Sequence, residues 1–276
     1  MVRAGSVELC AQAFGTRGDP AVLLISGSSS SMDWWEPGFC TALAGGGRFV
    51  IRYDLRDTGQ SVHYPVGSPD YGSRDLVADV AGLLDAYGVE RACLLGISMG
   101  GAIAQLTALL RPSRVSALVL LSTFAPGGPP VGMDPALAEY FQQAPETDWS
   151  DPAAVLDQQI DYQRELAAES VPFDEPAARA LTEAAFARTL DVRASLTNHD
   201  LIRSDVDDWY SRLGEIRVPT LVVHGAEDRF IRPAHGEALA RSIPGARLLL
   251  LPGVGHEFPR RAWGPVVPAV LEVSGA

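Results

Sequence analysis

The strongest constraint on the fold is an alternation of short apolar runs with longer segments whose apolar residues recur at helical spacing. Gly, Pro or Asp bounds each run, and near-continuous apolar character is typical of strands buried in a parallel sheet. The expected strands are Ala21 to Ser26, Phe49 to Asp54, Ala92 to Ile97, Val115 to Ser122, Thr220 to His224 and Arg247 to Leu251. The expected helices are Asp75 to Tyr87, Ala102 to Leu110 and Ala234 to Ser242. The chain is therefore predicted to be an α/β protein with a mostly parallel sheet flanked by helices.

The alternation stops between residues 124 and 209. This stretch opens with the Pro/Gly-rich loop Ala125 to Pro130 and continues with Ala- and Glu-rich helical pieces, and it has no strand pattern. We therefore expect one core made of residues 1–123 and 210–276, with a helical cap over residues 124–209 inserted between two core strands.

Composition limits the function classes. The net charge of −12 over 276 residues disfavours nucleic acid and anionic membranes as partners. The amino terminus lacks a secretory apolar stretch, and no apolar run approaches the length of a membrane span. Cys10, Cys40 and Cys93 are an odd number and lie far apart, so we expect buried thiols in a reducing, cytoplasmic compartment and no metal site.

One motif carries the chemistry. The segment Gly96-Ile97-Ser98-Met99-Gly100-Gly101 follows an expected strand and precedes an expected helix. A turn this sharp strains its central residue and needs small neighbours, and it lifts the hydroxyl of that residue clear of the sheet. Ser98 is therefore a candidate nucleophile; the alternative is a Gly-rich turn with an incidental serine.

A serine nucleophile needs a histidine base and a carboxylate that orients it, in the chain order Ser, Asp, His. Asp228 follows the strand expected to end at His224, and His256 follows the strand expected to end at Leu251. The loops after parallel strands meet at one edge of the sheet, where Ser98 also emerges. We expect Ser98, Asp228 and His256 to act together.

Each partner has rivals. The other histidines are His63, His199, His224 and His235. His224 ends a strand and His235 lies on a helix, so neither has the loop setting of His256. Glu227 is an alternative to Asp228. A carboxylate after the strand that follows the elbow helix is excluded, because that position reads Ser122-Thr123-Phe124. Asp54 and Asp57 precede Ser98, and we interpret their segment as a structural turn.

The oxyanion formed during acyl transfer needs two backbone N–H donors, one of which follows the nucleophile. Met99 and Ser28 are the candidates, although a flexible polar loop is an equal interpretation of Ser28. Candidate pocket residues, each with ordinary packing, capping or surface exposure as its alternative, are Gly27, Trp34, Phe124, Asn198 and His199.

With these motifs the chain resembles the α/β-hydrolase superfamily from about Val7 to Leu271. The segment Ile51 to Ser61, the Ser98 turn and the Asp228 and His256 segments look most like methylesterases that act on anthracycline antibiotics. The resemblance implies a nucleophile, acid and base at Ser98, Asp228 and His256, an oxyanion hole at Met99 and Ser28, and a methyl ester of a polycyclic aromatic polyketide as substrate.

The leading hypothesis is hydrolysis of a small-molecule carboxylic ester through an acyl-enzyme, with no metal or organic cofactor. A lactonase or carbon-carbon bond hydrolase with the same triad is the enzymatic alternative. A non-catalytic ligand-binding member of the same fold is the third hypothesis. The sequence does not indicate an oligomeric state.

Overall fold

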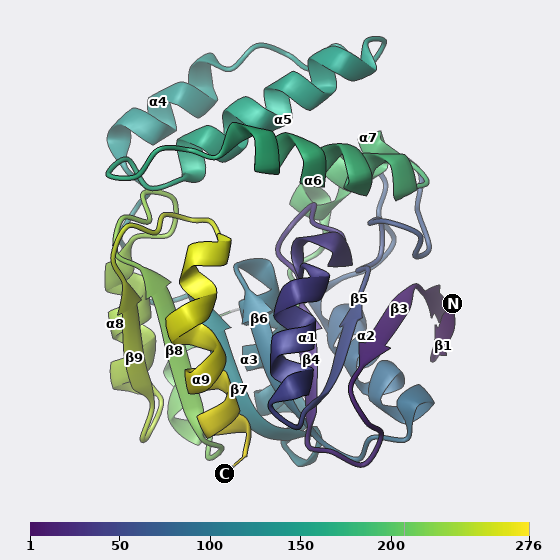
Figure 1. The fold of residues 1–276 in the computed structure, drawn as a ribbon, viewed down its shortest axis with the longest axis vertical. Helices are drawn as coiled ribbons and strands as arrows, with labels where there is room; N and C mark the ends of the chain where they lie inside the picture. The colour runs from purple at the N-terminus through teal and green to yellow at the C-terminus, as the bar shows by residue number, and fades with distance from the viewer. Residues whose placement is uncertain (207, 276) are drawn as a thin grey trace.

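A seven-stranded sheet forms the centre of the computed structural model, which describes residues 1–206 and 208–275 (Figure 1). Residues 207 and 276, each within one of the predicted domains, lie outside the described residues. The strands are β3 (Ala11–Phe14), β4 (Ala21–Ile25), β5 (Phe49–Tyr53), β6 (Ala92–Ile97), β7 (Val115–Leu121), β8 (Thr220–Gly225) and β9 (Arg247–Leu251). Their order is β3-β5-β4-β6-β7-β8-β9, and every neighbouring pair except β3 with β5 is parallel. The predicted α/β class is confirmed.

The six predicted strands are β4 to β9, with bounds that differ by at most one residue. The strands were expected to be buried on both faces. This holds for β4, β5 and β8 but not for β9, where Leu250 is 40% exposed. That expectation was wrong because β9 is an edge strand. The prediction missed β3 and the separate antiparallel pair β1 (Val2–Ala4) and β2 (Val7–Leu9), since all three are short and only partly buried.

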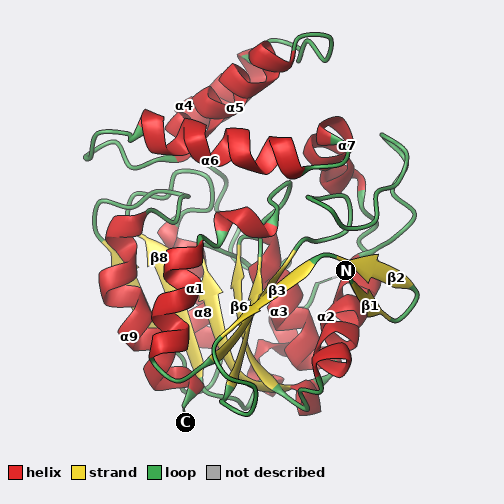
Figure 2. Ribbon diagram, turned by 45° about the vertical axis from the view of Figure 1, so that its right-hand side comes forward, coloured by secondary structure: helices red, strands yellow, loops and turns green. Residues whose placement is uncertain are grey.

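Helices cover both faces of the sheet (Figure 2). One apolar cluster joins the sheet to α1 (Pro37–Gly45) and α9 (Trp263–Ser274). The other joins it to α2 (Ser73–Tyr87), α3 (Met99–Leu110) and α8 (Pro233–Ser242), which are the three predicted helices. Helix α9 was not predicted. It contains Pro268, and proline normally breaks the interior of a helix.

The predicted insert, residues 124–209, lies within the connection from β7 to β8, and its helices lie across the carboxyl edge of the sheet (Figure 1). It contains α4 (Pro135–Gln143), α5 (Pro152–Leu166), α6 (Glu175–Arg188), α7 (Val192–Thr197) and the short 3-10 helix Asn198–Leu201. Each of the four α-helices begins after an aspartate whose carboxylate accepts backbone N–H bonds of the first turn: Asp134, Asp151, Asp174 and Asp191. These caps fix where the helices start.

The cysteines are all unpaired. Cys40 and Cys93 are buried as predicted, and burial raises the pKa of the Cys93 thiol to about 12. Cys10 departs from the prediction, since it is half-buried and its Sγ lies 3.9 Å from Nη1 of Arg188. Within the described ranges, no helix is long and apolar enough to cross a membrane.

Candidate active site

Ser98 forms the one-residue link between β6 and α3. Its φ of 53° and ψ of −120° place its backbone in a conformation that residues other than glycine rarely adopt, at a cost of about 1–3 kcal/mol. Two hydrogen bonds hold it there: its N–H donates to the carbonyl of Leu121 at 2.9 Å, and its carbonyl accepts from Thr123 Oγ1 at 2.7 Å. The strained turn predicted from the sequence is therefore present.

Two glycines make this turn sterically possible. A Cβ at Gly96 would overlap the carbonyl of Gly100, and a Cβ at Gly100 would overlap the carbonyl of Ile25 on the neighbouring strand. Because both obstacles are backbone atoms, neither position can accept a side chain without a shift of the backbone of α3 or of the sheet. The prediction that the turn needs small neighbours is confirmed.

The three side chains predicted to act together are in contact. His256 Nε2 lies 3.2 Å from Ser98 Oγ, and His256 Nδ1 lies 2.8 Å from Asp228 Oδ2. A carboxylate can only accept, so Nδ1 carries the proton and Nε2 presents its lone pair to the serine hydroxyl. The loop of His256 is held by the insert, because its backbone N–H donates to the carbonyl of Leu166 at the end of α5. This arrangement can move a proton from Ser98 to His256.

Asp228 is buried, with 2% of its surface exposed. Its Oδ1 accepts N–H bonds from Phe230 at 3.0 Å and Ile231 at 2.8 Å, and its Oδ2 faces His256 and, at 3.5 Å, His224 Nε2. Burial acts to raise the pKa of Asp228, but His256 and His224 outweigh it and lower that pKa below its ordinary value. Asp228 is therefore ionised at neutral pH and keeps the Nδ1 proton on His256.

The rivals have other partners. Glu227 bonds Ser170 through both the hydroxyl and the backbone N–H. His224 is fully buried and its Nε2 donates to the carbonyl of Ile231 at 2.6 Å, while His235 Nε2 lies 2.8 Å from the carbonyl of Val131. Neither histidine has a hydrogen bond to Ser98 in the described part of the chain.

The segment Asp54 to Gly59 is structural, as interpreted from the sequence. Asp57 accepts hydrogen bonds from the N–H of Tyr64 and the hydroxyl of Tyr71. Asp54 accepts N–H bonds from Met32 and Gln60.

The two backbone N–H groups expected to bind an oxyanion belong to Met99, at the start of a helix, and to Ser28, in an exposed loop. Met99 is the first residue of α3, where a backbone N–H has no partner within the helix. Ser28 is exposed in the loop after β4. Across residues 1–206 and 208–275, neither N–H donates to a protein acceptor. Gly27 packs against the nucleophile turn, since a Cβ there would come 3.4 Å from Ser98 Cβ.

The candidate pocket residues separate into two groups. Trp34 lines a cavity of about 30 Å³ between the Ser28 loop and helices α5, α6 and α7. Phe124 is 41% exposed, and its ring centroid lies 5.8 Å from that of His235. A pocket role for Trp34, Phe124 and Gly27 stays a prediction.

Asn198 and His199 do not lie on a pocket wall. His199 is also not at the exposed surface, which was its alternative, whereas Asn198 stands at the C-cap of α7, as its capping alternative proposed. Both are buried, at 0% and 4% exposure. Asn198 binds the loop from Tyr64 to Gly67 through both ends of its amide. His199 contacts Ser29 N and Arg56 O, each at 2.8 Å. Protein atoms therefore occupy the polar groups that a substrate would need.

An aromatic group near His256 was not singled out from the sequence. The ring of Phe230 lies 4.9 Å from that of His256, and Phe141 of α4 contacts Phe230 at 6.0 Å and Tyr162 of α5 at 5.5 Å. Phe230 follows Asp228 by two residues, but Phe141 and Tyr162 come from the insert, so only the fold brings these rings together.

Comparisons to known proteins agree with the fold. The family model described as alpha/beta hydrolase fold matches residues 20–259. The chain belongs to the α/β hydrolase fold family. It is 32% identical to the rhodomycin D methylesterase DauP of Streptomyces sp. (strain C5), over 98% of this chain and 96% of the relative. It is 31% identical to the rhodomycin D methylesterase DnrP of Streptomyces peucetius, with the same coverage.

Solved structures give the same fold. An enol-lactonase from Burkholderia xenovorans superposes with a TM-score of 0.73 at 27% identity, covering 99% of this chain and 98% of the other. A meta-cleavage product hydrolase from Pseudomonas fluorescens has a TM-score of 0.78 at 20% identity, covering 99% and 96%, which shows a shared fold alone. The family and the methylesterase relatives support an ester-hydrolysing enzyme that acts on a small molecule.

Proposed function

We propose that this protein is a serine esterase in which Ser98, His256 and Asp228 form a catalytic triad. The observation that carries the proposal is the continuous chain of contacts from Asp228 Oδ2 through both ring nitrogens of His256 to Ser98 Oγ. The ionised, buried Asp228 holds the imidazole in the tautomer that accepts a proton from the serine.

The reaction follows from this geometry. His256 Nε2 takes the Ser98 proton while Oγ bonds to the ester carbonyl carbon, and the carbonyl oxygen becomes an oxyanion held by the N–H groups of Met99 and Ser28. The carbon–oxygen bond to the alcohol then breaks, and His256 gives the alcohol its proton. Water attacks the acyl-enzyme with His256 again as base, which releases the carboxylic acid and restores Ser98.

We further propose a methyl ester of a polycyclic aromatic compound as the substrate. The similarity to the two rhodomycin D methylesterases over nearly the whole of each chain supports this class. The ring of Phe230 gives independent support, because it places an aromatic surface beside His256, and Phe141 and Tyr162 extend the aromatic cluster away from it. In this proposal residues 124–209 act as a cap that covers the substrate.

A lactone is the second candidate substrate, and the similarity to the enol-lactonase favours it. A lactone is a cyclic ester, so the same steps apply and the alcohol stays attached to the acyl group. Carbon–carbon bond hydrolysis and ligand binding without turnover stay as sequence-based alternatives, and the cytoplasmic location stays a prediction.

The test combines labelling with product analysis. A fluorophosphonate should label Ser98 stoichiometrically, and Ser98→Ala should abolish both labelling and hydrolysis of 4-nitrophenyl butyrate. Ser113→Ala is the matched control, because Ser113 is exposed beside the other end of α3. Methanol release from polycyclic aromatic methyl esters, compared with ring opening of lactones, identifies the substrate class. Retained turnover in Ser98→Ala would refute the triad.

A further inference from the structure

We infer that His199 is a positioning residue for the oxyanion hole: its imidazole joins the insert to the loop that carries the Ser28 N–H. His199 Nδ1 lies 2.8 Å from the backbone nitrogen of Ser29, the residue after Ser28. No other side chain in the described residues accepts a hydrogen bond from the Ser28–Ser29 backbone. This inference rests on the proposed function, since it assigns a role in binding the oxyanion of ester hydrolysis.

Hydrogen-bond chemistry fixes the tautomer of His199. The Ser29 N–H can only donate, so Nδ1 must present a lone pair. The carbonyl of Arg56 can only accept, so Nε2 must carry the proton. Only the neutral imidazole with a proton on Nε2 satisfies both, and burial favours this form by lowering the pKa of His199.

The loop that His199 holds is strained. Ser29 has a φ of 58°, in the left-handed region that favours glycine, and is the third residue of a four-residue turn in which Ser30 N–H donates to the carbonyl of Gly27. A non-glycine residue stays in this region only where its surroundings hold it there. The hydrogen bond to His199 is such a restraint, and it sets the peptide unit next to the Ser28 N–H that faces the oxyanion.

The other end of His199 is fixed to the core. Its acceptor, the Arg56 carbonyl, belongs to a residue whose guanidinium makes two 2.7 Å hydrogen bonds to the buried carboxylate of Asp79 in α2. Asn198 binds the adjacent loop through its amide at 0% exposure, which fixes the backbone beside His199. A continuous series of buried contacts thus runs from α2 through His199 to the Ser28–Ser29 loop.

Two substitutions separate the ends of the imidazole. His199→Asn keeps an acceptor near the position of Nδ1 and loses the Nε2 donor. His199→Gln keeps a donor near the position of Nε2 and loses the acceptor for Ser29 N–H. If the contact positions the oxyanion donor, His199→Gln lowers kcat for 4-nitrophenyl butyrate by about 10- to 100-fold with little change in KM, because displacing such a donor affects the transition state more than the substrate. His199→Asn stays within about threefold of wild type.

A trifluoromethyl ketone gives an independent measure, because it adds to Ser98 to form an oxyanion. His199→Gln should weaken its binding in proportion to the loss in kcat, whereas His199→Asn should not. A merely structural role would affect both variants alike. If the wild-type enzyme is active, equal losses in His199→Gln and His199→Asn therefore overturn the inference. An inactive wild type instead refutes the proposed esterase and, with it, this role.

The tautomer can be checked in the wild-type protein, whatever the variants do. Nitrogen-15 NMR of labelled histidine should show Nδ1 of His199 unprotonated and Nε2 protonated at pH 7.5. A protonated Nδ1 would remove the acceptor for Ser29 N–H and overturn the inference.

Discussion

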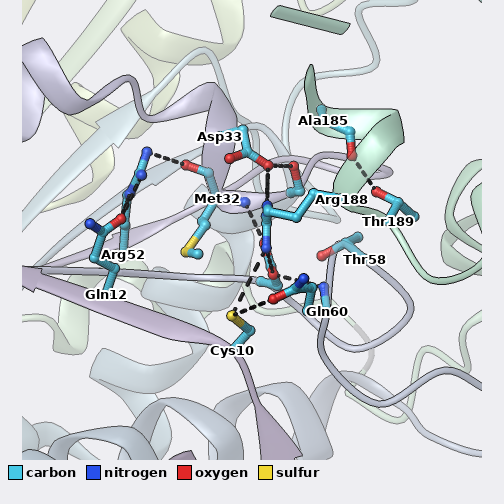
Figure 3. A network of polar contacts seen from close by, with 12 residues as sticks. Cys10, Gln12, Met32, Asp33, Arg52, Thr58, Gln60, Ala185, Arg188 and Thr189 are labelled. Atoms are coloured by element: carbon cyan, nitrogen blue, oxygen red, sulfur yellow. Dashed lines mark hydrogen bonds and ion pairs between the residues drawn. The ribbon is translucent and has the colours of Figure 1, made fainter. Parts of the chain in front are cut away.

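Arg188, the last residue of α6, makes two hydrogen bonds of 2.7 Å with the two carboxylate oxygens of Asp54. The same guanidinium also binds Asp33 Oδ2 through Nε at 2.9 Å and Nη2 at 2.6 Å (Figure 3). Asp54 follows β5, whereas Arg188 belongs to the insert, so one side chain ties the insert to two segments of the core. The Asp54 side chain has no exposed surface, and Arg188 is the cation that contacts it.

Replacing Arg188 with methionine should lower the free energy of unfolding by about 2–3 kcal/mol, because the substitution leaves a buried carboxylate without its counter-charge. The loss stays below that of a wholly buried ion pair since the Arg188 side chain is 21% exposed. Urea unfolding measures the change. Arg212→Met is the matched control: Arg212 pairs with exposed Glu215, and this change should lower the free energy of unfolding much less. Equal shifts in the two variants would contradict the prediction.

Asp228→Asn should reduce kcat by about 10⁴-fold, the effect that the same change has in serine proteases, because an amide at this position favours the wrong tautomer of His256. KM should change far less. Glu227→Gln is the control, since Glu227 bonds Ser170 rather than His256 and should leave kcat near the wild-type value. Hydrolysis of 4-nitrophenyl butyrate measures both, and the reverse order of effects would assign the acid to Glu227.

Stability should depend on pH through His199. Burial lowers the pKa of His199 in the folded protein, and His63 lowers it a little further. The Arg56 carbonyl, Asp57 and Asp200 act to raise this pKa, but burial outweighs them. As the pH falls below about 6.5, His199 of the unfolded chain takes up a proton while the folded protein keeps it neutral. The free energy of unfolding should therefore fall by up to about 1.4 kcal/mol per pH unit until the lowered pKa is reached.

His199→Asn removes the titrating imidazole, so comparing this variant with the wild type isolates the contribution of His199 to the pH dependence of stability. Urea unfolding of both proteins between pH 8 and pH 5.5 should show the stability advantage of the wild type shrinking as the pH falls. A difference between the two proteins that stays constant across this range would show that His199 does not titrate as described.

The central sheet and the three catalytic candidates could be predicted because short stretches of sequence indicate each of them. A strand buried in a parallel sheet is a continuous apolar run, and the residues that follow such strands meet at one edge. Ser98, Asp228 and His256 each follow a run of this kind, so their contact follows from strand order even though 158 positions separate the serine from the histidine.

The contacts of the insert could not be predicted in this way. Arg188 meets Asp54 across 134 positions, and His199 meets Ser29 across 170, with no periodic pattern in either segment that indicates its partner. An arginine near the end of a helix and a histidine in a short turn are ordinary surface residues until packing places them. The sequence therefore predicted an insert and singled out His199, but it indicated neither the partner of His199 nor any role for Arg188.

The turn at Ser98 gives a last prediction, about packing. At Gly100 a Cβ would overlap the carbonyl of Ile25 on β4, and β4 and β6 are paired directly before the turn, so the strand has no room to withdraw. Gly100→Ala should therefore destabilise the fold by about 3 kcal/mol or more, as overpacking and backbone strain do in cores. Gly264→Ala in α9 is the control, because open space surrounds the site and its φ is not left-handed. Alanine favours a helix over glycine, so this change should raise the stability slightly, by about 0.5 kcal/mol. Thermal unfolding that ranks Gly100→Ala equal to Gly264→Ala would show that the turn can open to accept a side chain.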